Sequence, residues 1–150
     1  MAANTVPIFP LTPNSLAGKL VGATGIAKSD GTGTVATDMI LLFTAGADGA
    51  YVEGVQFWPS ASAVGTATTA TVLRVYLSTK TSGATSNLDT FLLGELTAAQ
   101  QTADSATVAT TILSLAINRK IGANQTILAS SHVTNAGSTS WSAVCFGASY

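Results

Sequence analysis

The chain has 150 residues, and only 9% of them are Asp, Glu, Lys or Arg, whereas soluble domains carry about 25% charge. Its six basic side chains are scattered and form no stripe, which argues against nucleic-acid binding. A chain so poor in charge must avoid aggregation by closing its sheets or by burying its surface against partners. The composition therefore favours a building block of an assembly over a free enzyme, and the length fits one domain.

The N-terminal stretch, residues 1–16, differs in composition from the rest of the chain. Prolines recur there at every third position, with apolar residues between them. Proline fixes φ and removes a backbone donor, so we expect an extended, unpaired arm. Such an apolar arm should lie on the domain or on a neighbouring subunit, because it is costly to leave in water. The residues concerned are Val6, Pro7, Ile8, Phe9, Pro10, Leu11 and Pro13.

Residues 17–150 are expected to form one domain of short β-strands separated by turns. Thr and Val are abundant, and alternation between apolar and polar residues is clearest from Leu73 to Ser78. Glycine, asparagine and aspartate mark the separating turns. We expect strands at 17–27, 34–44, 50–59, 69–79, 89–97, 106–117, 125–134 and 139–149.

About eight short strands at regular intervals predict an all-β fold. The expected architecture is an antiparallel, jelly-roll-like β-sandwich, and a small barrel is the alternative. Residues 95–104 could form a turn or two of helix, but no stretch carries an apolar stripe at helical spacing. The pairing order of the strands stays open, since alternation indicates faces and not neighbours.

Few residues could support catalysis. His132 is the only histidine, and Ser131 beside it should point to the opposite face of a strand. Glu53 and Glu95 are the only plausible carboxylate pair for glycoside hydrolysis. With one histidine and one cysteine, the chain lacks the usual ligands of a zinc site. We therefore expect no enzyme activity and no catalytic, cofactor or metal site, and we expect Cys145 to be a small buried hydrophobe.

We expect neither a targeting signal nor a membrane-spanning segment in this chain. Residues 1–4 show no basic region followed by an apolar run, so we expect no signal peptide. The longest apolar run, Met39–Phe43, is too short to span a bilayer. We therefore expect synthesis in a cytoplasm and no membrane partner.

The large aromatic residues suggest an interface. Phe57 and Trp58 are consecutive on an expected strand, so they should face opposite sides of its sheet. The one that leaves the core side is covered by the arm or belongs to a subunit interface, where Trp and Tyr are enriched. Tyr150 directly follows an expected strand, so we expect the C-terminus to be tied into the sheet.

Four segments follow one another in a familiar order: Val6–Pro13, Gly31–Thr37, Leu42–Val52 and Val72–Leu77. Together they resemble the small structural proteins of tailed-bacteriophage virions. The likeness runs from the arm to the end of the chain, and Leu42–Val52 is its most specific part. Within that group the chain is similar to the head decoration, or cement, proteins.

The resemblance implies a β-sandwich subunit, usually trimeric, on the outer capsid surface. Such subunits bridge neighbouring major capsid subunits against the pressure of packed DNA. The number of strands suits a jelly-roll cement protein better than the β-tulip type. We therefore expect a homotrimer in the virion of a phage, made in the cytoplasm of a host bacterium, with the major capsid protein as partner. The expected capsid or subunit contacts are Val6, Pro7, Ile8, Phe9, Pro10, Leu11, Pro13, Trp58 and Tyr150.

Two other functions fit the same sequence. A tail-associated protein that binds a host receptor or carbohydrate would use exposed aromatic residues, for which Tyr51, Trp58 and Trp141 are the candidates. A small glycan hydrolase would require Glu53 and Glu95 to face each other across a cleft.

Overall fold

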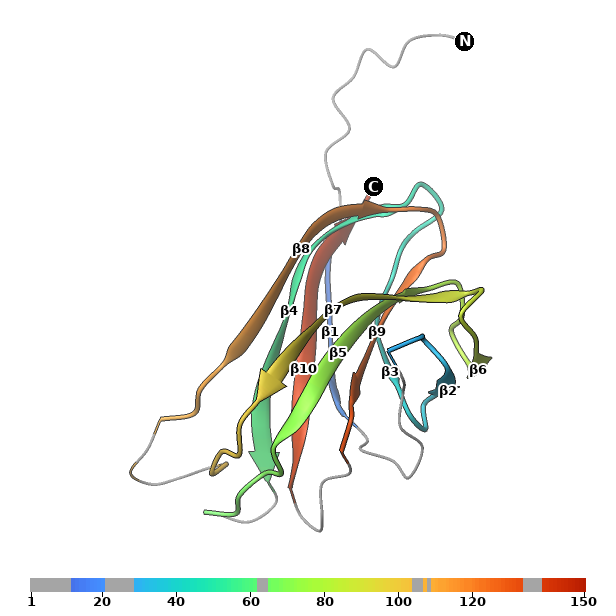
Figure 1. The fold of residues 1–150 in the computed structure, drawn as a ribbon. Helices are drawn as coiled ribbons and strands as arrows, with labels where there is room; N and C mark the ends of the chain where they lie inside the picture. The colour runs from blue at the N-terminus through green and yellow to red at the C-terminus, as the bar shows by residue number, and fades with distance from the viewer. Residues whose placement is uncertain (1–11, 21–28, 62–64, 104–106, 108, 134–138) are drawn as a thin grey trace, which may run out of the picture.

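The computed structural model describes residues 12–20, 29–61, 65–103, 107, 109–133 and 139–150 (Figure 1). Within these residues the chain forms ten β-strands and no helix, and hence no helix that could cross a membrane. The strands are β1 (Thr12–Lys19), β2 (Gly33–Val35), β3 (Ile40–Thr44), β4 (Ala50–Ala61), β5 (Thr71–Ser78), β6 (Gly83–Thr85), β7 (Thr90–Ala98), β8 (Leu113–Ile121), β9 (Thr126–Ser131) and β10 (Thr139–Ser149).

Eight of the strands form two four-stranded antiparallel sheets that face each other (Figure 1). The first sheet has the order β1-β10-β4-β8, and the second has the order β3-β9-β5-β7. Leaving out the short strands β2 and β6, the first strand lies beside the last, and successive strands of the chain fall into the two sheets in the order of a jelly roll. The all-β, jelly-roll-like sandwich expected from the sequence is confirmed.

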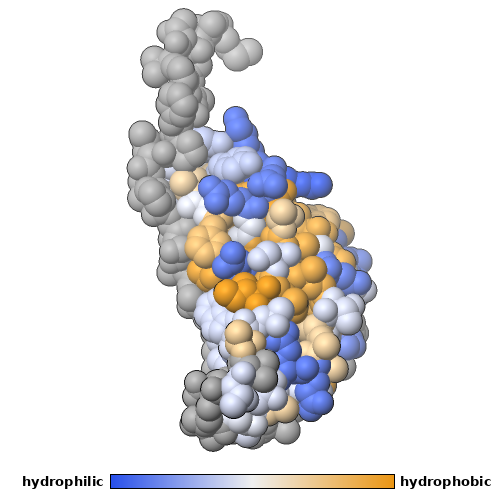
Figure 2. All heavy atoms as spheres, turned by 90° about the vertical axis from the view of Figure 1, so that its left-hand side faces the viewer, coloured by the Kyte–Doolittle hydropathy of each residue, from blue (hydrophilic) through white to orange (hydrophobic). Residues whose placement is uncertain are grey.

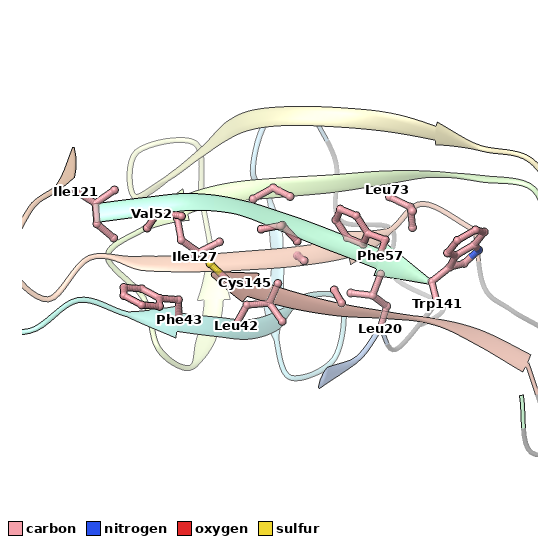
Figure 3. Close-up of a cluster of buried hydrophobic side chains, with 14 of the residues drawn as sticks. Leu20, Leu42, Phe43, Val52, Phe57, Leu73, Ile121, Ile127, Trp141 and Cys145 are labelled. Carbon is pink, nitrogen blue, oxygen red and sulfur yellow. The ribbon is translucent and has the colours of Figure 1, made fainter. Parts of the chain in front are cut away.

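The core lies between the two sheets and follows the period-two pattern of the sequence (Figure 3). On β5, Leu73 and Val75 are fully buried in this core, and β10 contributes Trp141 and Cys145 to it from the opposite sheet. Burial raises the pKa of Cys145 to about 12, because the thiolate would lose its hydration. Cys145 is therefore the buried hydrophobe that the sequence predicts.

A second, smaller cluster covers the outer face of the second sheet. Strands β2 and β6 pair with each other and lie over that sheet (Figure 1). Val35 and Met39 from this cover pack against Tyr76 of β5 and Leu128 of β9, and all four side chains are buried. The second sheet is therefore packed on both sides, once by the core and once by its own chain.

The structure corrects the expected elements at several positions. The strand expected at 34–44 is two strands, because a turn at Ala36, where φ is 72°, separates β2 from β3. The helical turn considered at 95–104 is wrong over its described part, since β7 continues to Ala98 with Leu96 packed against the core and Thr97 exposed. The residues that follow Ala98 pair instead through a bridge between Ala67 and Thr102.

The start of β1 and the end of β10 lie side by side at one edge of the first sheet. Residues 12–16, which we assigned to the arm, lie in β1, and Thr12 is the register partner of Ser149. Pro13 is tolerated there because β1 is an edge strand. Residues 1–11, and with them most of the expected arm, lie outside the described residues.

Candidate functional site

Trp58 lies on the outer face of the first sheet. Phe57 is fully buried in the core, whereas its neighbour Trp58 is half-buried on the other side of β4, opposite Ser142 of β10. The sequence-based prediction that these two aromatic residues face opposite ways is confirmed. In contrast to the second sheet, no described strand covers this outer face.

Charged side chains are scarce in the middle of this face, whereas the edge strand β8 carries Arg119 and Lys120. The two central strands, β4 and β10, carry a single charged side chain, Glu53. Phe146 of β10 is 38% exposed, and Val144 on the same strand is half-buried. Figure 2, which views the molecule from the side of β8 and β4, shows apolar side chains gathered in the middle with hydrophilic ones above and below. The face therefore has the composition of a contact surface.

A groove of about 190 Å³ opens on this face. Its lining includes Phe146 of β10, Gly54 of β4 and Ala116 of β8. A Cβ on Gly54 would lie 2.6 Å from the carbonyl oxygen of Leu115, so only glycine fits at this position. The missing side chain leaves a depression between Phe146 on one side and β8 on the other.

Glu53 stands at the edge of the groove because β4 bulges there. The register of β4 shifts between Val52 and Gly54 against β8, and Glu53 has no register partner on either neighbouring strand. A bulge of this kind re-aims a side chain, and Glu53 is exposed. Among the described residues it forms no salt bridge. The groove thus combines an aromatic wall, a glycine floor and one carboxylate.

The expected carboxylate pair is not assembled. Glu95 lies on β7 in the second sheet, where its Oε2 is 3.0 Å from Nε of Arg74 on the outer side of β5. Glu53 belongs to the first sheet, so the core separates the two carboxylates. The geometry that a glycan hydrolase would require of this pair is therefore absent, and that interpretation is wrong.

His132 lies in the polar part of the outer face of the second sheet, which we call the covered face because β2 and β6 lie over it. Its Nδ1 lies 2.7 Å from a terminal guanidinium nitrogen of Arg74 and accepts its hydrogen bond. Ser131 points inward instead, and its hydroxyl donates to the carbonyl oxygen of Val133. The prediction that Ser131 and His132 point to opposite faces is confirmed.

The other aromatic candidates are distributed over the fold. Trp141 is fully buried in the core, so it cannot contact a receptor. Tyr51 lies on β4, where its hydroxyl is 3.5 Å from Oδ1 of Asn118. Tyr150 donates its N–H to the carbonyl oxygen of Gly49, which confirms that the described C-terminus is tied to the body. The ammonium of Lys120 lies 5.5 Å from the centre of the Tyr150 ring, a cation–π arrangement.

Of the interface residues predicted from the sequence, the structure describes Pro13, Trp58 and Tyr150. Tyr150 lies beside the start of β1, where residues 1–11 join the body, whereas Trp58 lies toward the other end of β10. Val6, Pro7, Ile8, Phe9, Pro10 and Leu11 lie outside the described residues. Phe146 and Gly54 were not among the interface residues predicted from the sequence. Phe146 was detectable, because it is out of phase with the inward-facing Trp141 and Cys145.

The comparisons with known proteins leave the family open. No family model and no curated protein match the chain. Its fold is similar to one chain of "Structure of infectious bursal disease virus Gx strain", with 12% identity and a TM-score of 0.34, and to one of "Structure of infectious bursal disease virus Gt strain", with 14% identity and a TM-score of 0.29. The matches cover 99% and 97% of this chain but only 36% and 33% of those chains. The chain thus spans about a third of the length of these viral chains, and likeness at this level carries no functional argument.

Proposed function

We propose that this chain is a non-enzymatic structural protein of a phage virion, which decorates the outer capsid surface and cements it by bridging major capsid subunits. The outer face of the first sheet supports a role in an assembly, because its two central strands carry a single charged side chain, Glu53, and its middle is apolar. An exposed apolar patch with a polar rim is typical of an interaction surface. The resemblance of Leu42–Val52 and the flanking segments to cement proteins supplies the identity of the partner.

The body is suited to bridging because it is stiff. Two packed sheets share one core, and the second sheet is braced again by β2 and β6. Jelly rolls also occur in lectins and cupins, so the fold is compatible with a virion role but does not distinguish that role from other functions. A homotrimer on a capsid would bind through several equivalent contacts, and avidity would then hold it firmly even where each contact is weak.

We assign the capsid contact to the end of the sandwich where the arm begins. Thr12 lies opposite Ser149, so residues 1–11 join the body next to Tyr150. A proline-rich arm loses less conformational entropy on binding than a flexible one. The arm and Tyr150 would therefore act together on a neighbouring capsid subunit.

Deleting residues 1–11 should abolish binding to capsids that lack this protein. Thermal unfolding should change little, because β1 begins at Thr12. Co-sedimentation with capsids measures binding, and particle imaging locates the bound copies. Thr97→Arg, at an exposed position of β7, is the control and should bind normally. Full capsid occupancy by the truncated chain would refute the assignment of the contact to the arm.

A tail-associated, carbohydrate-binding protein is the second candidate. The groove favours it, because Phe146 offers an aromatic wall for a sugar ring and Glu53 and Gln56 offer polar contacts. Labelling the protein in intact particles separates the two functions. Label over the head lattice supports the decoration protein, and label confined to the tail supports the carbohydrate-binding protein.

A further inference from the structure

One contact on the covered face joins the only histidine of the chain to a buried arginine. Nδ1 of His132 lies 2.7 Å from a terminal guanidinium nitrogen of Arg74, whose side chain is only 11% exposed. A guanidinium stays charged in proteins and can only donate hydrogen bonds. The imidazole must therefore accept at Nδ1, so it is neutral here and carries its proton on Nε2.

The contact lies where β9 ends beside β5. The last residue of β9 is Ser131, and the backbone N–H of His132 donates to the carbonyl oxygen of Val72 at 2.9 Å. The N–H of Val133 donates at 2.9 Å to the hydroxyl of Thr71, the first residue of β5. The next strand of the chain, β10, belongs to the first sheet. His132 is therefore one of the last described ties between β9 and β5 before the chain crosses to the other sheet.

The charged groups around this contact do not favour a second cation. Glu95 on β7 pairs with Arg74, and no described carboxylate, Asp38 in the turn before β3 included, forms an ion pair with His132. Burial raises the pKa of Tyr76 on β5 from its ordinary value of 10.0, so its hydroxyl stays neutral. The strands β2, β3, β6 and β9 carry no charged side chain. A protonated His132 would therefore add a positive charge beside Arg74 without a carboxylate of its own.

We propose that this contact is a pH-sensitive switch in the fold, which is made while His132 is neutral and broken when His132 is protonated. A protonated imidazole has no acceptor at Nδ1, so two cationic donors would face each other at 2.7 Å. Histidine is the side chain that ordinarily changes its charge between about pH 5 and pH 8. The unfolded chain takes up the proton freely, whereas the folded chain must give up the contact with Arg74. The stability that the contact contributes is therefore present with the neutral imidazole and is lost as the pH falls.

Urea denaturation of the full chain at about pH 7.5 and about pH 5.5 tests the switch, and it is independent of the proposed decoration function. The urea midpoint of the wild type should be lower at the acidic pH. His132→Gln should have the same midpoint at both, because the amide oxygen accepts from Arg74 and takes up no proton, while every other ionisable group is kept. Glu95→Gln should enlarge the difference between the two pH values, because it removes the carboxylate that pairs with Arg74.

NMR of the wild type locates the effect without any variant. Because the chain has one histidine, its ring gives one set of signals, and the nitrogen shifts should identify the Nε2–H tautomer at about pH 7.5. The backbone N–H of His132 should be about fivefold less protected from hydrogen exchange at about pH 5.5, after correction for the intrinsic rate, whereas that of Val75 in the middle of β5 keeps its protection. An Nδ1–H tautomer would overturn the proposal. So would a wild-type midpoint that stays constant, or one that falls equally in His132→Gln.

Discussion

The outer faces of the two sheets differ in whether strands of the chain pack over them. The chain covers the second sheet itself, with β2 and β6 packed over Tyr76 and Leu128. No described strand covers the outer face of the first sheet, where Phe146 and Trp58 lie. A single chain can bury both faces of one sheet only if some of its own residues pack over the outer face. The uncovered face therefore indicates where a partner is expected, and the covered face where none is needed.

The largest expected effect comes from removing the buried aromatic residue of the covered face. Tyr76 is fully buried, and its hydroxyl lies 3.2 Å from Oγ of Ser130. Tyr76→Ala should lower the free energy of unfolding by about 3–5 kcal/mol, as for other large aromatic residues in a core. Trp58→Ala, on the outer face of the first sheet, should lower the free energy of unfolding by only about 1 kcal/mol. Urea denaturation measures both variants.

Tyr76→Phe separates packing from hydrogen bonding in the same cluster. It should cost only about 1 kcal/mol, because the ring still fills its place while Ser130 loses a partner. Equal losses for Tyr76→Ala and Trp58→Ala would mean that the two faces are packed alike, and the comparison between them would fail.

The sequence predicts the covered face less well than the core. Alternation from Leu73 to Ser78 identifies β5 and both of its faces, and similar patterns locate most of the long strands. Strands β2 and β6 are three residues long, too short to show alternation. Their pairing depends on contacts between segments about fifty positions apart, which a local pattern does not contain.

The sequence predicts some features of the outer face of the first sheet and of its groove. Val52 and Val55 stand three positions apart in the sequence with Glu53 and Gly54 between them, which breaks the period of two, and the structure has a bulge there. That β8 lies on one side of Gly54 and Phe146 on the other depends on the strand order, and alternation does not determine it.

A smaller, pH-dependent effect is expected at the turn that joins the cover to β7. Hydrogen bonds, first from the backbone N–H of Ser86, hold the pKa of Asp89 below its ordinary value of 3.8. A carboxyl whose pKa is lower in the folded than in the unfolded chain stabilises the fold above the unfolded pKa, and this contribution is lost as the pH falls through the folded pKa. Asp89→Asn should therefore lower the urea midpoint at pH 7, and the difference from wild type should narrow below about pH 4.

Asp48→Asn is the matched control for this measurement, because Asp48 is exposed in the turn before β4. It should leave the midpoint at pH 7 nearly unchanged. If the urea midpoint of Asp89→Asn stayed below that of the wild type by the same amount from pH 7 to pH 3, the charge of Asp89 would not contribute to stability.

The smallest effect is expected in the polar part of the covered face. The side chain of Glu95 is 49% exposed, whereas that of its partner Arg74 is only 11% exposed. An ion pair with one side in water contributes little, so Glu95→Gln should cost about 0.5 kcal/mol, and less in high salt. The amide oxygen of glutamine can still accept from Arg74, which also keeps its hydrogen bond to His132. A loss above about 3 kcal/mol would instead make this pair, and not the packing around Tyr76, the main support of the covered face.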